Sequence, residues 1–176
     1  MMKITSSKKV YDCGLFWVTE DCAVDPKTNF RIKRSVVRHR GSAVMMAMDG
    51  ERQILLVRQF RLPAAKYLWE LPAGSVDPGE KPFATARREL VEETGYRARS
   101  WKKLASFFVS PGFVAERMTI YLATGLIAGE ARPMQDERIE TRWFAAAEVE
   151  RMIRAGKIED AKTIVGYFTW KNGGGR

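Results

Sequence analysis

The sequence predicts a mixed α/β sandwich to which an N-terminal region of antiparallel strands is attached. Three observations favour this class. The chain has 176 residues, of which 45% are hydrophobic, enough for one packed core. Strand-like and helix-like segments follow one another without the strict β-α-β repetition of a doubly wound sheet. No apolar run is long enough to cross a bilayer, and the first nine residues carry charge without an apolar stretch. We therefore expect a cytoplasmic protein.

Three regions are expected along the chain. Residues 1–40 form the N-terminal strand region, in which short strands are interrupted by the turn-forming segment Asp25-Pro26-Lys27-Thr28-Asn29. Residues 41–172 form the main α/β domain. Residues 173–176, Gly-Gly-Gly-Arg, form a flexible tail.

The main domain begins with a β-hairpin pattern. A mostly apolar strand at residues 42–48, which is rich in methionine, precedes Asp49-Gly50, a dipeptide typical of hairpin turns. The remaining expected strands cover residues 53–60, 66–71, 103–109, 118–124 and 139–144. Two helices are expected near the C-terminus, at residues 146–155 and 159–170, with Gly156 between them.

One helix is predicted with defined ends, from Pro82 to Thr94. Proline suits the first helical turn, and Gly95 suits the position just beyond the last turn. Phe83, Ala86 and Leu90 recur at helical spacing, so we expect them to form the buried face.

The charge and the cysteines exclude little. The net charge is +9, which suits an anionic small molecule, although the basic residues are spread without interleaved aromatic residues, so a nucleic-acid partner is not expected. Cys13 and Cys22 lack metal-ligand spacing and are read as reduced, partly buried thiols. His39 is the only histidine, which excludes histidine-based triads and zinc sets, and we expect a surface or edge-strand role for it.

Three glutamates share one side of the predicted helix. Glu89, Glu92 and Glu93 are three and four residues apart, so their carboxylates project together. Carboxylate oxygens are preferred ligands of Mg²⁺, which usually shares them with a phosphate. Without further residues, a solvated acidic helix face explains the triplet equally well.

The spacing around these glutamates is far more specific. The segment is GSVDPGEKPFATARRELVEETGY (74–96). Its first glycine is followed six positions later by a glutamate, and seven residues separate that glutamate from Arg-Glu-Leu. After one further residue come two glutamates, and after another comes a glycine. This segment resembles the Nudix signature at every fixed position. One mild departure is Tyr96, which stands where an aliphatic residue is more usual.

The resemblance implies a fold and a set of roles. The fold is a Nudix-type α/β/α sandwich with a mixed β-sheet, and the activity is hydrolysis of a nucleoside diphosphate linked to another group. Glu89, Glu92 and Glu93 would bind Mg²⁺, with Mn²⁺ as the alternative ion, together with the carbonyl oxygen of Ala73. Structural roles within the motif would fall to Gly74, Glu80, Arg88 and Gly95.

Segments outside the signature resemble the ADP-ribose pyrophosphatase branch. These are Val57–Arg61, Trp69–Gly74 and Ser110–Phe113. The resemblance implies Mg²⁺-dependent cleavage of ADP-ribose to AMP and ribose 5-phosphate. It also implies a homodimer in which the N-terminal region contributes to the substrate site. The residues that would contact substrate are Arg61, Arg58, Trp17 (or its neighbour Phe16) and Glu116.

Each of these substrate contacts has an ordinary alternative. An aromatic residue at position 17 could simply pack in the sheet, and the two arginines and Glu116 could be solvated surface residues. The general base in this branch lies on a loop after the signature. Glu137 is the candidate for base or additional metal ligand, followed by Asp136 and Glu140. Gln135 departs from the acid that some relatives carry, and a solvated charged loop is the alternative interpretation.

Three rival functions stay open on the sequence. GDP-mannose or another nucleotide sugar would be cleaved by the same chemistry. Removal of the 5′ pyrophosphate from RNA is compatible with the basic charge. A non-catalytic nucleotide-binding module is the third, although such modules typically lose signature carboxylates, and here all are present.

Overall fold

The structure is a computed structural model that describes residues 1–131 and 138–173. The chain divides into two compact units. The first comprises Met1–Gly41 and Phe107–Met118, and the second comprises Ser42–Ser106 and Thr119–Arg176. The predicted region 1–40, with its roles in dimerisation and substrate contact, stays a prediction. Within the described residues, no helix has both the length and the apolar character that a membrane crossing requires.

The first unit contains a three-stranded antiparallel sheet of order β1-β2-β3. Its strands are β1 (Lys3–Asp12), β2 (Trp17–Val24) and β3 (Arg31–Arg38). The expected turn at 25–29 separates β2 from β3, and Asn29 adopts the left-handed conformation that asparagine tolerates. A parallel bridge links Val37 with Val114, which lies in the second segment of this unit.

The second unit contains two further sheets. One has the order β10-β5-β6, built from β5 (Gln53–Arg61), β6 (Lys66–Glu70) and β10 (Glu140–Ala145). The other has the order β7-β4-β9-β8, in which β4 is Ser42–Ala47 and β7 is Ala73–Ser75, while β8 (Arg97–Phe108) and β9 (Arg117–Ile127) extend into the first unit. A short 3₁₀ turn, Leu62–Ala64, joins β5 to β6.

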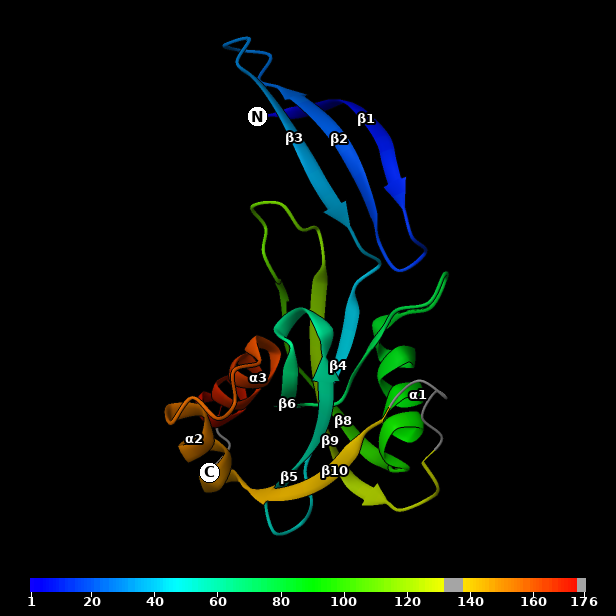
Figure 1. Cartoon of the computed structure of the whole chain (residues 1–176), viewed down its shortest axis with the longest axis vertical. Helices are drawn as coiled ribbons and strands as arrows, with labels where there is room; N and C mark the ends of the chain where they lie inside the picture. Colours follow the sequence, from blue (N-terminus) through cyan, green and yellow to red (C-terminus); the bar gives the residue numbers. More distant parts are fainter. Residues whose placement is uncertain (132–137, 174–176) are drawn as a thin grey trace. The chain divides into compact units, whose positions relative to one another are not determined.

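Three helices lie against the strands of the second unit. Helix α1 (Pro82–Thr94) packs on β4 and β7, α2 (Ala146–Arg154) contacts β5 and β10, and α3 (Ala161–Asn172) contacts β4. Figure 1 shows α1 on one side of these strands and the pair α2 and α3 on the other. The predicted α/β/α sandwich is therefore confirmed.

The core of the second unit is centred on β4. All six residues of this strand are buried, and Met45 packs with Leu55, Ala86 and Leu90. The methionine-rich strand is thus core, as predicted. The expected buried face of α1 is partly wrong, because Phe83 is 41% exposed. Its ring instead forms a T-shaped contact with Trp101 and a tilted contact with Tyr121 at the edge of the core.

One sequence expectation about a single residue was also wrong. Cys13 is exposed rather than partly buried, and its thiol donates a hydrogen bond to the Phe16 carbonyl in the tight turn after β1. His39 directly follows β3, an edge strand of the first sheet, and its side chain has contacts that the sequence did not reveal. Its Nδ1 accepts a hydrogen bond from the Gly41 amide at 3.0 Å and lies 3.5 Å from Oε1 of Glu116. The exposure of Cys13 arises from the local turn, whereas the contact of His39 with Glu116 joins segments that are distant in sequence.

Candidate active site

The glutamates of α1 lie at graded depths in the second unit. Glu93 is buried, the Glu89 side chain is 15% exposed and the Glu92 side chain is 40% exposed. The gradient arises because Ala86 and Leu90 turn the helix toward the core, which tilts one edge of the acidic face inward. A continuous path of carboxylates therefore leads from the surface into the fold.

Arg88 gathers most of these acids around one guanidinium group. Its Nη1 donates to Oε1 of Glu89 at 2.7 Å and to Oε2 of Glu92 at 2.9 Å. Its Nη2 donates to Oε2 of Glu80 at 3.0 Å and lies 3.3 Å from Asp77. Because Glu89 and Glu92 share one nitrogen, their carboxylates converge on the same point.

Glu80 is held in the loop before α1 by two side-chain donors and by the Asp77 amide, which donates to Oε2 at 3.4 Å. Arg88 binds both of its oxygens, and the buried Thr85 hydroxyl donates to Oε2 at 2.7 Å. The hydrogen bond from Arg88, supported by that from Thr85, outweighs the opposing effect of burial and lowers the pKa of Glu80 to about 2. The same contacts raise the pKa of Arg88. This loop is therefore fixed to the helix by charge at neutral pH.

Gly74 allows Glu89 to reach the backbone of the neighbouring strand. A Cβ atom at position 74 would overlap the carboxyl group of Glu89. The glycine is needed for space here, whereas its own backbone conformation is ordinary. Ala73 and Gly74 are held by pairing of β7 with Val44 and Ala43 of β4. The backbone beside Ala73 therefore lies next to a signature carboxylate.

The donor set fits a hard divalent cation. The groups that approach one another on α1 are carboxylates, the neighbouring β7 offers main-chain oxygens, and no histidine or cysteine belongs to the set. Within residues 1–131 and 138–173, no three acidic, histidine or cysteine side chains already surround one point. Arg88 Nη1 lies where the carboxylates of Glu89 and Glu92 converge, so the positive charge between these two acids is the Arg88 guanidinium.

Arg61, the predicted substrate contact, pairs with a buried acid that the sequence reasoning missed. Its Nε donates to Oε1 of Glu70 at 2.8 Å and its Nη2 donates to Oε2 at 2.9 Å. Glu70 is 1% exposed and also accepts a hydrogen bond from buried Lys162. Burial raises the pKa of Glu70, but the bonds and charges of Arg61 and Lys162 outweigh it, so the net pKa is lowered. A clue was present, because Glu70 stands between Trp69 and Leu71 in an apolar segment.

Arg58 lies on the sheet formed by β5, β6 and β10. Its guanidinium lies 5.0 Å from the ring centre of Tyr67 and 6.0 Å from that of Trp69, and its Nη1 donates to Glu140 at 3.4 Å. Arg58, Tyr67 and Glu140 border an open hollow of about 340 Å³ that Arg138 also lines. The two rings stabilise the guanidinium charge by cation–π interactions.

Two further predicted contacts belong to the first unit. Trp17 is half-buried at the start of β2, with the ammonium group of Lys9 lying 5.8 Å from its ring centre. The Glu116 side chain is 18% exposed and faces His39. The interaction with His39 had no signal in the sequence, because 77 positions separate the two residues and only the parallel bridge at Val37 brings their segments together.

The predicted base falls outside the described residues. Glu137, Asp136 and Gln135 all lie within 132–137, which the structure does not describe, whereas Glu140 is described at the start of β10.

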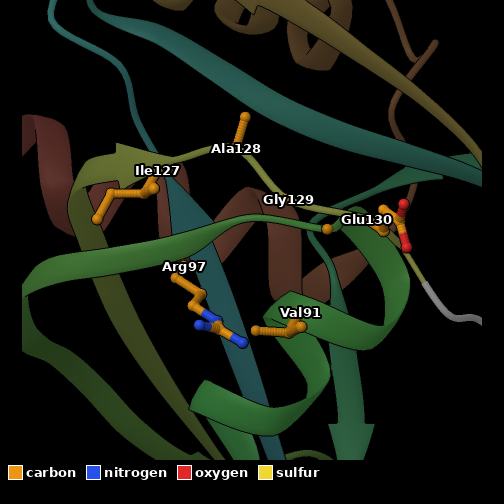
Figure 2. Close-up of a pocket in the computed structure, with 7 residues that line it drawn as sticks. Val91, Arg97, Ile127, Ala128, Gly129 and Glu130 are labelled. Carbon is orange, nitrogen blue, oxygen red and sulfur yellow. The ribbon is translucent and has the colours of Figure 1, made fainter.

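Gly95 lets residues 129–131 pack against the end of α1. Its φ of 75° ends the helix in the left-handed conformation, and a Cβ there would lie 2.7 Å from both the Gly129 oxygen and the Ala131 nitrogen. Figure 2 shows the adjoining pocket of about 320 Å³, into which Arg97 points beside Val91. The glycine thus ends the helix and permits close backbone packing.

Comparisons with known proteins agree with this geometry. Residues 37–165 match the NUDIX domain family model. The chain is 40% identical over 166 residues to an ADP-ribose pyrophosphatase of Mycobacterium tuberculosis, covering 93% of this chain and 80% of the relative. It is 38% identical over 133 residues to an ADP-ribose pyrophosphatase of Bacillus subtilis, covering 74% and 72%.

Two other matches are informative about the range of the fold. A GDP-mannose pyrophosphatase of Cronobacter sakazakii is 34% identical over 145 residues, covering 77% of this chain and 75% of the relative. The crystal structure of an ADP compounds hydrolase superposes with a TM-score of 0.80 at 20% identity, covering 98% of this chain and 96% of that one. At that identity the structural likeness concerns the fold alone.

Proposed function

The chain belongs to the Nudix domain family and is a Nudix pyrophosphohydrolase, and from this premise we propose that its substrate is ADP-ribose. The products would be AMP and ribose 5-phosphate. The observation that carries the proposal is the set of α1 carboxylates in the signature spacing, converging beside β7. Two ADP-ribose pyrophosphatases at 38% and 40% identity support the choice of substrate.

The proposed metal ligands are Glu89, Glu92, Glu93 and the Ala73 carbonyl oxygen. The ion is Mg²⁺, with Mn²⁺ as the alternative. When bound, such ions neutralise diphosphate charge and increase the acidity of water. Arg88 and Glu80 orient the metal-binding glutamates. Arg88 holds Glu89 and Glu92 at one point, while Glu80 fixes Arg88 from the opposite side.

The substrate contacts are assigned by the chemistry of each group. A guanidinium has five N–H donors, and Glu70 takes two from Arg61, which leaves donors for diphosphate oxygens. Arg58 would bind a second polar group of the substrate, and Trp17 would stack on adenine. Glu116 would accept hydrogen bonds from substrate hydroxyls. Glu137 would accept the proton from the attacking water.

The homodimer predicted from the family is also proposed here. The first unit exposes apolar side chains on its strands and turns, which is the kind of surface that a second copy covers. The exposed apolar residues include Ile4, Val10, Tyr11, Leu15, Phe30, Phe108, Val109 and Phe113. Sedimentation velocity over a hundred-fold concentration range tests the proposal. A monomer at all concentrations would exclude it.

The substrate is tested with a hydrolysis panel at fixed Mg²⁺, with and without chelator. The panel contains ADP-ribose, GDP-mannose, UDP-glucose, NADH, diadenosine polyphosphates and a 5′-triphosphorylated RNA. We expect chelator-sensitive turnover with the highest kcat/KM for ADP-ribose, and AMP as the nucleotide product. A different preferred compound would keep the chemistry and reject the substrate. Binding without turnover of any compound would reject the enzyme.

Glu93→Gln tests the metal assignment. The change removes one charge at nearly constant shape, so we expect kcat to fall on the order of a thousand-fold while the fold is retained. Binding of Mn²⁺, followed by electron paramagnetic resonance, should weaken in parallel. Near-normal turnover at saturating Mg²⁺ would contradict the assignment, whatever the substrate. Glu148→Gln, a half-buried acid in the first turn of α2, is the control.

GDP-mannose is the second candidate substrate, favoured by the relative at 34% identity. Both candidates share a diphosphate and differ in the base and the sugar. The panel separates them directly, because the product is GMP in one case and AMP in the other.

A further inference from the structure

Glu70 is the most deeply buried acid of the second unit that the proposed chemistry does not use. It is 1% exposed, and its carboxylate accepts bonds from Arg61 on both oxygens and from Lys162 on Oε2. A buried carboxylate of this kind is costly unless it is fully paired, and here two cations pair it. Its position at the end of β6, next to the Leu71-Pro72-Ala73-Gly74 segment, places it beside the strand that approaches Glu89.

Arg61 is held by this acid in a defined orientation. The two parallel bonds, at 2.8 and 2.9 Å, engage one edge of the guanidinium plane. The side chain is still 39% exposed, so its other edge reaches solvent. The charge of Glu93 contributes to the raised pKa of Arg61, after the larger effect of the bond from Glu70. The Arg61 charge is therefore within electrostatic reach of Glu93, one of the signature acids.

Lys162 connects Glu70 to the beginning of α3. Lys162 is 6% exposed, and its ammonium group also donates to Oδ1 of Asp160 at 3.0 Å. Asp160 caps the helix by accepting from the Thr163 amide at 3.0 Å, and the Thr163 hydroxyl accepts from the Leu71 amide at 2.8 Å. The hydrogen-bond network thus ends at Leu71, the residue after Glu70, and forms a closed ring of contacts.

We propose that Glu70 and Lys162 are positioning residues that hold the Arg61 guanidinium with its free edge toward the diphosphate. The proposal rests on the proposed function, because it assigns to Arg61 the role of binding substrate phosphates. Two bonds fix the plane of the guanidinium, and the ammonium group fixes the carboxylate that makes them. Without Glu70, Arg61 would sample many rotamers and would lose that order each time substrate binds.

A merely structural role for the network predicts a different result. If Glu70 only balanced Lys162 in the core, its loss would lower stability without acting through Arg61. The two roles are separated by a double-mutant cycle, because a residue that works through Arg61 has no further effect once Arg61 is absent.

The experiment measures KM and kcat for ADP-ribose with Arg61→Ala, Glu70→Gln and the double variant, together with their thermal unfolding. We expect Glu70→Gln to raise KM about ten-fold in the parent chain and no more than about two-fold in the Arg61→Ala background. The melting temperature should fall in both backgrounds. An equal rise in KM with and without Arg61 would overturn the proposal.

Lys162→Met provides the same test if Glu70→Gln does not fold. It leaves the Arg61–Glu70 pair intact and removes only the outer cation, so we expect KM to rise about three-fold, again only when Arg61 is present. An unchanged KM in the folded Lys162→Met variant would exclude the role of Lys162. Equal increases in both backgrounds would overturn the positioning role.

Glu159→Gln is the matched control. Glu159 pairs with Lys66 and so joins the same two regions, β6 and the approach to α3, but this pair is about half exposed. Its loss should leave KM unchanged. Failure of the proposed function would be recognised separately, as absence of ADP-ribose hydrolysis by the unaltered chain. The positioning role fails if the unaltered chain hydrolyses ADP-ribose but the effects of Glu70→Gln and Arg61→Ala are independent of each other.

Discussion

The two units of the chain differ sharply in how they are stabilised. Among the described residues, every buried hydrophobic side chain of the core belongs to the second unit. The first unit has ten consecutive exposed residues along β1, and only Thr19 is buried within its three strands. One unit has a core that can support a charged site, whereas the other is a thin sheet held by its backbone ladder.

The difference explains where chemistry can be placed in this chain. Closely packed carboxylates repel one another, and a rigid support must hold them together. In the second unit β4, α1 and β7 supply that support. A sheet of three strands without a covered face has little stability of its own. The first unit therefore suits contacts with a second copy and with substrate, as proposed above.

Among the substitutions that leave every charge in place, the largest effect is expected at the tightest contact of the second unit. Gly74→Ala would insert a methyl group into the Glu89 carboxyl and displace it, so kcat/KM should fall on the order of a hundred-fold. Gly50→Ala is the control, since nothing lies within 4 Å of a Cβ at that position. Full activity of Gly74→Ala would mean that Glu89 need not lie where the structure places it.

The next effect concerns the core beneath the site. Leu90 is fully buried and packs with Ala86 and Met45. Leu90→Ala should lower the free energy of unfolding by about 2–5 kcal/mol, because a cavity adds to the lost transfer free energy. Urea denaturation measures the change. A loss below about 1 kcal/mol would show that this core is not the main support of the fold.

Acid stability provides a smaller and pH-dependent contrast. Because the pKa of Glu80 is lowered to about 2 from the ordinary 4.5, its contribution is present above pH 4.5 and is lost as the pH falls toward 2. Glu80→Gln should cost on the order of 1 kcal/mol at pH 7, after allowance for solvent screening, and little at pH 2.

The matched substitution in the first unit is Asp12→Asn, which removes an exposed ion pair with Lys9. Stability should barely change with it at either pH. A pH-independent loss on Glu80→Gln would contradict the assignment of this carboxylate as the ionised partner of Arg88.

The smallest effect is expected in the first unit. Ile4 is 67% exposed on β1, opposite Ala23. At concentrations low enough to keep the chain monomeric, Ile4→Ala should change the free energy of unfolding by no more than about 0.5 kcal/mol. Thermal melts over a dilution series measure it. A large, concentration-independent loss would mean that β1 is covered within a single chain.

Local sequence signals were reliable where neighbouring residues decide the structure. The bounds of α1, Pro82–Thr94, match the prediction, because proline and glycine act on the backbone at their own positions. The clustering of Glu89, Glu92 and Arg88 likewise follows from helical spacing. The exposure of Phe83 was mispredicted, since periodicity gives a direction and does not say how far the core extends.

The sequence by itself determined the family, the sandwich class and the acidic signature on its helix. These depend on short-range spacing, which a linear chain displays directly. Only the tertiary structure revealed the bonds from Arg61 to Glu70 and from Glu70 to Lys162, the overlap that requires glycine at position 74, and the contact of His39 with Glu116. The physical reason is that these contacts join residues brought together by strand pairing and helix packing, and burial decides which charged groups must find one another.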